Sequence, residues 1–298
     1  MFRPAGVMAA IVTPMFTDER LNLKELANHV NRVIDKGIHG IFCLGTNGEF
    51  YTMSQQERVE VIETVVEAAD RRVPVLAGVG AISTQETIKL TRIAESLNVD
   101  AVSVITPYFV PLSQAELTRH YRSVADATSL PVMLYNIPMR TGNHIDTKTV
   151  ADLAAVPNIV GIKDSTGRLD NLISYIESCP QDFAVFSGND SIILDGLKAG
   201  AKGAIAAIAN ICPDWLSEIY DAWKRGDDEG ASDAQARVNA VREILSGGNP
   251  NTMVKKAVNL LGFPVGPARE PVSGDSDAAE AHVRSVLQSV GLIPTAVS

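Results

Sequence analysis

Short runs of apolar residues alternate with longer amphipathic stretches over the first two thirds of this 298-residue chain. The runs begin roughly 20 to 35 residues apart, which is the spacing that a strand, a loop and a helix together require. This alternation predicts repeated βα units around a parallel sheet. The eight expected strands are Val7–Val12, Gly40–Leu44, Pro74–Gly78, Ala101–Ile105, Pro131–Tyr135, Ile159–Lys163, Ala184–Ser187 and Ala204–Ala207. Eight units are the number that closes a (β/α)₈ TIM barrel, so we expect that α/β fold.

Helix starts are marked independently by a serine followed three residues later by a glutamate, the pattern of a capping box. Three such pairs follow expected strands: Ser54 with Glu57, Ser83 with Glu86, and Ser113 with Glu116. The alternative architecture is an open, doubly wound sheet. The first strand is followed by Thr13-Pro14-Met15-Phe16 and not by a GxGxxG phosphate loop, and eight regular units favour the closed barrel.

The strand pattern stops after about residue 211, and the rest of the chain has the periodicity of helices separated by Gly, Pro and Asn breaks. We expect helices at Pro213–Lys224, Asp228–Leu245, Thr252–Leu261 and Ser276–Val290. The sequence therefore predicts a catalytic barrel at residues 1–210 and a helical extension at 211–298 that packs on the barrel.

Composition excludes several classes of partner. Hydrophobic residues make up 46% of the chain and charged residues 20%, as in ordinary globular proteins. The formal net charge is −9, and no cluster of Lys and Arg offsets it, so we expect no nucleic-acid partner. No apolar stretch approaches the roughly 20 residues that span a bilayer, and the first residues lack a signal pattern. We therefore expect no membrane partner and a cytoplasmic location.

The cysteines and histidines give no sign of a metal site. Cys43, Cys179 and Cys212 are widely spaced without a CxxC pair, and the five histidines show neither HxH nor HExxH spacing. We accordingly predict no disulfide framework and no metal cofactor.

Lys163 stands at the end of the apolar run Ile159–Ile162, where a buried strand should leave the core. Burial disfavours the ammonium form, and the free amine is the nucleophile with which a Schiff-base enzyme attacks a carbonyl. The alternative is a lysine that extends from the strand end into water, as most lysines do.

Other polar residues follow neighbouring strands and should share the same mouth of the barrel. The loop Gly45-Thr46-Asn47-Gly48-Glu49 offers backbone amides and short side chains to an anion such as a carboxylate, although an ordinary glycine turn has the same composition. Tyr135 could transfer a proton, and Arg140 could hold a second carboxylate. A rim tyrosine and a solvated arginine are the alternatives for these two residues.

Three segments resemble the signatures of the dihydrodipicolinate synthase/N-acetylneuraminate lyase family: Gly45-Thr46-Asn47-Gly48-Glu49, Tyr135-Asn136-Ile137-Pro138 and Gly161-Ile162-Lys163-Asp164. The flanking Thr13-Pro14, Thr106-Pro107-Tyr108 and Ser187-Gly188 agree in order and spacing, and the match runs nearly end to end. The resemblance implies a class I aldolase barrel that joins pyruvate to a lysine as an imine and needs no cofactor. It also implies a homotetramer built as a dimer of dimers.

Carried over to this chain, the resemblance implies that Lys163 forms the Schiff base and that Tyr135 transfers the proton. Thr46 would link tyrosine hydroxyl groups and, with Asn47, hold the pyruvate carboxylate. The remaining family positions are Gly188 and Ile205, whose backbone would face bound pyruvate, and Arg140, which would receive the carboxylate of aspartate semialdehyde. Arg140 thus favours 4-hydroxy-tetrahydrodipicolinate (dihydrodipicolinate) synthase activity, a step of lysine biosynthesis.

Two departures from the family pattern leave the substrate open. Asn47 replaces the second threonine of the synthases, and Phe109 replaces a tyrosine that completes a proton relay in the neighbouring subunit. A general acid or base contributes two to four orders of magnitude in rate, so the missing hydroxyl matters. The alternatives are an aldolase that releases pyruvate from 2-keto-3-deoxy sugar acids or 4-hydroxy-2-oxoglutarate, and a catalytically inactive homologue that binds keto acids.

Overall fold

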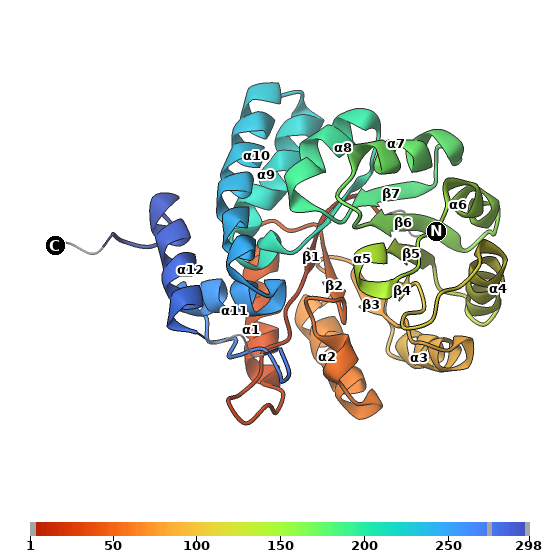
Figure 1. The fold of residues 1–298 in the computed structure, drawn as a ribbon, viewed down its shortest axis with the longest axis horizontal. Coiled ribbons are helices and arrows are strands. Elements are labelled where there is room, and N and C mark those ends of the chain that lie inside the picture. The colour runs from red at the N-terminus through yellow and green to blue at the C-terminus, as the bar shows by residue number, and fades with distance from the viewer. Residues whose placement is uncertain (1–3, 273–275, 296–298) are drawn as a thin grey trace.

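Eight parallel strands close into a barrel in the order β1 to β8, with β1 paired to β8, in the computed structural model, which describes residues 4–272 and 276–295 (Figure 1). The strands are β1 Gly6–Ala10, β2 Gly40–Cys43, β3 Val75–Gly78, β4 Ala101–Ile105, β5 Val132–Asn136, β6 Ile159–Asp164, β7 Ala184–Ser187 and β8 Gly203–Ala206. All eight predicted strands are confirmed, with ends that differ by at most two residues, and so is the TIM barrel.

The strands are continuous apolar runs because both faces of a parallel barrel sheet are covered. Every strand residue is buried except Val160, which is partly exposed. Side chains inside the barrel fill its interior, and those outside pack against the surrounding helices.

Helices alternate with the strands and surround the barrel (Figure 1). They are α1 Leu23–Asp35, α2 Gln55–Ala69, α3 Thr84–Ser96, α4 Gln114–Ala125, α6 Thr147–Ala154, α7 Leu169–Ser178, α8 Ile193–Ala199 and α9 Pro213–Arg225. A short helix, α5 Pro138–Thr141, lies in the loop after β5, and the 3₁₀ turns are η1 Phe50–Thr52, η2 Asp190–Ile192 and η3 Ile208–Asn210. In α1 the residues Leu26, His29, Val30 and Val33 are buried, which is the spacing of one helix face.

Two of the three predicted capping boxes form in full. Ser54 and Ser113 each accept a hydrogen bond from the backbone N–H of the glutamate three residues on, and that glutamate accepts one in return. The third prediction is only half correct. Ser83 accepts from Glu86 N at 3.2 Å, but the Glu86 carboxylate lies 3.9 Å from Lys89 Nζ, because the lysine one turn along the helix attracts it.

The C-terminal part forms α10 Asp228–Arg242, η4 Glu243–Gly247, α11 Pro250–Leu260 and α12 Asp277–Ser289. The helix expected at Asp228–Leu245 ends at Arg242 and continues as the 3₁₀ turn η4. Helix α9 contacts both α8 and β1, and so takes the eighth position of the helical ring. The boundary at residue 210 stays a prediction, and this packing favours a boundary after α9. Within the described ranges, no helix is long and apolar enough to cross a membrane.

Helix α10 is anchored beside the mouth of the barrel. Gln235 Nε2 donates to the carbonyl oxygen of Asp190 at 2.9 Å, and Gln235 Oε1 accepts from Leu194 N at 3.0 Å. The end of α10 and the start of α11 therefore lie over the loops that follow the strands, and side chains from the C-terminal part reach the cavity described below.

Candidate active site

Lys163 and Tyr135 lie side by side on adjacent strands, because β5 and β6 pair in a register that sets these two residues opposite each other. Their side chains are almost fully buried, with exposed fractions of 4% and 3%. The Lys163 amine lies 4.3 Å from the ring centre of Tyr135 and 4.9 Å from that of Phe42. The sequence prediction that Lys163 leaves the strand in a buried position is confirmed, and the solvated alternative is wrong.

The hydroxyl groups of Thr46 and Tyr135 lie within hydrogen-bonding distance, with 3.3 Å between Thr46 Oγ1 and Tyr135 Oη. Phe42 packs edge-on against the Tyr135 ring and holds it in place. A proton could therefore pass between the two hydroxyl groups beside the buried amine.

One cavity of about 420 Å³ opens beside Lys163. All seven residues that the sequence predicted for the site line it: Thr46, Asn47, Tyr135, Arg140, Lys163, Gly188 and Ile205. They come from the loops or ends of β2, β5, β6, β7 and β8, which converge because the carboxyl ends of parallel barrel strands share one face. The structure brings the predicted set together, and the roles of its members remain proposals.

Gly188 lies close to Lys163. A Cβ atom at this position would lie 2.9 Å from Lys163 Cε and 2.1 Å from Ser165 Oγ. Its backbone N–H donates to the carbonyl oxygen of Asp164 at 2.7 Å, so the loop after β7 runs directly beside the end of β6. Only a residue without a side chain leaves space for Lys163 here.

Arg140 lies at the entrance on the short helix α5 and is exposed. It also lines an adjoining cavity of about 260 Å³, together with Thr46, Tyr51, Tyr108 and Asn251. An exposed guanidinium at the entrance could receive a carboxylate that extends outward from the amine.

A buried hydrogen-bond network fixes the strand ends that carry Tyr135 and Lys163. Asn136, the residue after Tyr135, donates to Asp164 Oδ1 at 2.8 Å, and Asp164 is the residue after Lys163. Thr166 Oγ1 donates to Asp164 Oδ2 at 2.6 Å. Burial raises the pKa of Tyr175, whose hydroxyl accepts from Asn136 at 3.2 Å. The network holds the side chains of Tyr135 and Lys163 in one relative position.

The C-terminal part holds the loop that carries Thr46. Asn251 of α11 donates from Nδ2 to the carbonyl oxygen of Thr46 at 2.9 Å. One turn further on, Lys255 Nζ lies 2.6 Å from Glu49 Oε1, and both side chains are almost completely buried. Burial lowers the pKa of Lys255, and the charge of Glu49 opposes that effect. Two residues of one helix thus fix both ends of the segment 46–49.

Sequence reasoning missed several residues of the cavity wall, among them Asp190, Arg242 and Asn251. The sequence does contain a signal for Asp190, because this residue follows the predicted strand end Ser187 and the predicted site residue Gly188 by only a few residues. Burial raises the pKa of the Asp190 carboxyl group, whereas a hydrogen bond from Ile208 and the positive charges of Arg242 and Lys163 act to lower it. Arg242 and Asn251 lie on helices whose sequence shows only amphipathic periodicity.

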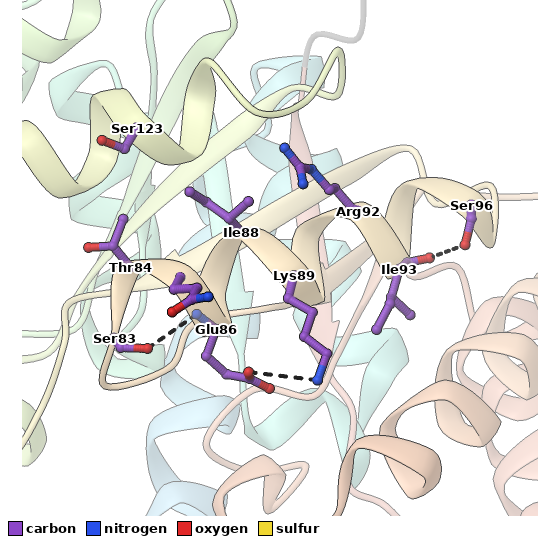
Figure 2. A pocket seen from close by; sticks show the side chains of 10 residues that line it. Ser83, Thr84, Glu86, Ile88, Lys89, Arg92, Ile93, Ser96 and Ser123 are labelled. Atoms are coloured by element: carbon purple, nitrogen blue, oxygen red, sulfur yellow. Dashed lines mark hydrogen bonds and ion pairs between the residues drawn. The ribbon is translucent and has the colours of Figure 1, made fainter.

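A larger hollow of about 1050 Å³ lies on the outer surface of α3 (Figure 2). Ser83 caps the helix there, and Glu86 pairs with Lys89 across one turn. These polar groups satisfy each other on α3, and only Ser123 of the lining residues comes from the neighbouring helix α4 (Figure 2), so we place the chemistry in the smaller cavity beside Lys163.

Nowhere in the described ranges do three or more His, Cys, Asp or Glu side chains come together in a group that could hold a metal ion. The expectation that the protein needs neither metal nor cofactor stays a prediction.

Comparison with known proteins places this geometry in context. Residues 3–290 match the model of the dihydrodipicolinate synthetase family. An uncharacterised DapA-like lyase of Halobacterium salinarum is 38% identical over 288 residues, which cover 97% of this chain and 94% of the relative. The 4-hydroxy-tetrahydrodipicolinate synthase of Methanopyrus kandleri is 36% identical over 296 residues, or 98% of each chain.

A solved structure has nearly the same fold. The chloride-inhibited dihydrodipicolinate synthase of Acinetobacter baumannii, complexed with pyruvate, superposes with a TM-score of 0.94 at 35% identity. The match covers 97% of this chain and 99% of that one.

Proposed function

The chain belongs to the dihydrodipicolinate synthetase family, and we propose that it is a Schiff-base lyase that joins pyruvate to an aldehyde or releases it from a longer 2-oxo acid. The observation that carries this proposal is the buried amine of Lys163 beside the Tyr135 ring, with the Tyr135 hydroxyl 3.3 Å from that of Thr46. A nucleophilic amine and a proton-transfer group are the two parts that imine formation needs.

In the proposed reaction the Lys163 amine attacks C2 of pyruvate, and the resulting carbinolamine loses water to form the imine. Tyr135 donates the proton with which that water leaves, and its phenolate, held by the Thr46 hydroxyl, then takes a methyl proton from the imine. The resulting enamine carbon attacks the aldehyde, and Tyr135 returns the proton to the aldehyde oxygen. Hydrolysis or ring closure then frees the lysine. Thr46 and Asn47 hold the pyruvate carboxylate, and the backbone at Gly188 and Ile205 borders the bound pyruvate.

The first candidate for the second substrate is aspartate semialdehyde, which would make the protein a 4-hydroxy-tetrahydrodipicolinate synthase of lysine biosynthesis. Arg140 at the cavity entrance supports it, because a guanidinium can hold the aldehyde's carboxylate in a two-point contact. Several relatives named 4-hydroxy-tetrahydrodipicolinate synthase, among them the Methanopyrus kandleri protein, also support it.

The second candidate is an aldolase that releases pyruvate from a 2-keto-3-deoxy sugar acid or 4-hydroxy-2-oxoglutarate. Asn47 lines the cavity in place of the synthases' threonine. Phe109 is 89% exposed at a positive φ of 82°, and it has no hydroxyl group to offer to any relay. The cytoplasmic location and the tetramer of two dimers stay predictions.

Chemical trapping tests whether the amine of Lys163 forms an imine with pyruvate. Pyruvate with borohydride should convert the imine into a stable adduct on Lys163, and Lys163→Ala should show neither adduct nor turnover. Tyr135→Phe should still form some adduct, but its turnover should fall by about 10²- to 10⁴-fold. Lys255, a second buried lysine, is an internal control because Glu49 occupies its amine. An adduct that maps to Lys255 would contradict the assignment.

The substrate is tested by two assays run together, condensation of pyruvate with aspartate semialdehyde and pyruvate release from 2-keto-3-deoxygluconate and 4-hydroxy-2-oxoglutarate. Condensation alone supports the synthase, and release alone supports the aldolase. An adduct on Lys163 without turnover in either assay would identify a homologue that only binds keto acids.

A further inference from the structure

Arg242 is a second arginine in the cavity that contains Lys163, and it comes from the C-terminal part of the chain. It is the last residue of α10, seven residues after Gln235, and residues seven apart lie on nearly the same face of a helix. Gln235 binds the backbone of Asp190 and of Leu194, so α10 is fixed against the loop after β7. The anchored face of the helix thus brings Arg242 to the cavity.

The Arg242 guanidinium is not fully used by the protein itself. Its Nε atom is buried and has no hydrogen-bond partner among the residues that the structure describes. A buried donor without a partner costs free energy, so the protein itself does not hold this guanidinium in a complete hydrogen-bond network. The side chain is partly exposed and lines the cavity, so its positive charge is available to a ligand there.

The charges around the cavity are unusual for this protein. Lys163, Arg140 and Arg242 all line it, and Asp190 is the one carboxylate among its lining residues. The chain as a whole has a net charge of −9, so this local excess of positive charge does not follow from composition. A cleft lined by one sign of charge concentrates ligands of the opposite sign.

We propose that Arg242 binds an anionic group, a carboxylate or a phosphate, at the end of the substrate distant from the imine. The cavity then takes 2-oxo acids with a second negative charge. This inference rests on the proposed function and narrows it to substrates whose distal end is anionic. The inference favours 4-hydroxy-2-oxoglutarate and similar acids. Arg140 would then contact the other end of a long substrate or act at the cavity entrance.

An alternative role for Arg242 is purely structural, since its charge acts on the buried carboxylate of Asp190. The two roles differ in what they do to selectivity. A structural defect lowers the turnover of all substrates alike, whereas a lost contact to the substrate lowers only the turnover of substrates that carry the anionic group.

The experiment compares substrates that differ only in that group. The carboxylate pair is 4-hydroxy-2-oxoglutarate with 4-hydroxy-2-oxopentanoate, and the phosphate pair is 2-keto-3-deoxy-6-phosphogluconate with 2-keto-3-deoxygluconate. We measure kcat/KM of pyruvate release for the wild type, Arg242→Met and Arg242→Lys. Arg237→Met is the matched control, since Arg237 lies on the same helix, is exposed and stacks on Trp215 outside the cavity.

We expect Arg242→Met to lower kcat/KM for one anionic substrate by about 10- to 100-fold, as loss of a hydrogen bond to a charged group predicts. The counterpart that lacks the distal anionic group should change by less than about threefold, Arg242→Lys should retain part of the selectivity, and Arg237→Met should behave as wild type. The pair that responds identifies the anion as a carboxylate or a phosphate.

Equal losses on both members of each pair would overturn the inference, and so would a wild type that turns over neither anionic substrate. Borohydride trapping of pyruvate separates this failure from that of the proposed function. If the wild type forms the adduct on Lys163 but selectivity does not depend on Arg242, only the inference about Arg242 fails. If the adduct does not form, the proposed function fails as well.

Discussion

At the scale of single residues, the space around the Lys163 amine is set as much by an absent side chain as by the side chains present. Gly188 lies between the end of β6 and the loop after β7, where an added Cβ would come within 2.9 Å of both Lys163 Cε and the carbonyl oxygen of Asp164. The carbonyl belongs to the backbone of the barrel strand β6 and cannot move aside. The lysine is the softer neighbour, so a larger residue would displace the amine.

We therefore expect Gly188→Ala to reduce activity more than stability. Overpacking costs about 1–3 kcal/mol of unfolding free energy, which a barrel of this size tolerates, while a displaced amine should form the pyruvate adduct at least tenfold more slowly. The measurements are the rate of borohydride trapping and the melting temperature. Adding Ser165→Ala removes the nearest clash, at 2.1 Å, and should restore part of the rate. Trapping at the wild-type rate in Gly188→Ala would contradict this account.

The candidate residues on the strands could be predicted from sequence because their position has a local signal. Lys163 and Tyr135 each end an apolar run, and the ends of parallel strands meet at one face whatever the rest of the chain does. Arg242 and Asn251 have no such signal. Their place in the cavity depends on how two helices far along the chain pack across the barrel mouth, and helical periodicity does not specify that.

At the scale of elements, α11 holds the loop after β2 in place. It holds this loop by a hydrogen bond from Asn251 to the Thr46 carbonyl and by the ion pair between Lys255 and Glu49. Glu49 has a positive φ of 58°, an unfavourable conformation that the surrounding contacts must maintain. The same carboxylate accepts a hydrogen bond from the backbone of Arg269 at 2.8 Å. The extension is thus part of the site and supports its loop.

Removing one partner of this buried pair should be costly. Lys255→Met leaves the Glu49 carboxylate uncompensated in the interior, and we expect a loss of about 3–5 kcal/mol in unfolding free energy. The double variant Lys255→Met/Glu49→Gln should recover much of that loss. The control is Lys148→Met, which breaks the exposed pair with Asp152, of length 2.9 Å, and should cost less than about 1 kcal/mol. Denaturant unfolding measures the free energy of unfolding of all three variants. Equal losses in Lys255→Met and Lys148→Met would contradict a stabilising role of the buried pair.

At the scale of the whole molecule, the barrel was predictable because eight buried strands and their spacing leave few closed arrangements. Its stability depends also on buried polar groups that no sequence pattern indicated. His29 of α1 is completely buried, and its Nε2 lies 2.9 Å from Asn210 Oδ1, in the turn after β8. The residue thus connects the first helix of the barrel to the last unit, and its protonation affects the closure of the ring.

Acid should consequently weaken the fold well above the range in which most carboxylates titrate. Burial lowers the pKa of His29 from 6.5 to about 3, and the charge of Arg32 acts in the same direction. Between these two values the unfolded chain binds a proton that the folded protein excludes, so stability falls as pH decreases below 6.5 and is unaffected above it. At pH 5 the loss from His29 alone is about 2 kcal/mol. Thermal melting from pH 7.5 to 4.5 should show this decline, and His29→Gln should show a shallower one because glutamine does not titrate. A variant with the wild-type slope would mean that His29 takes up its proton in the folded protein as readily as in the unfolded chain.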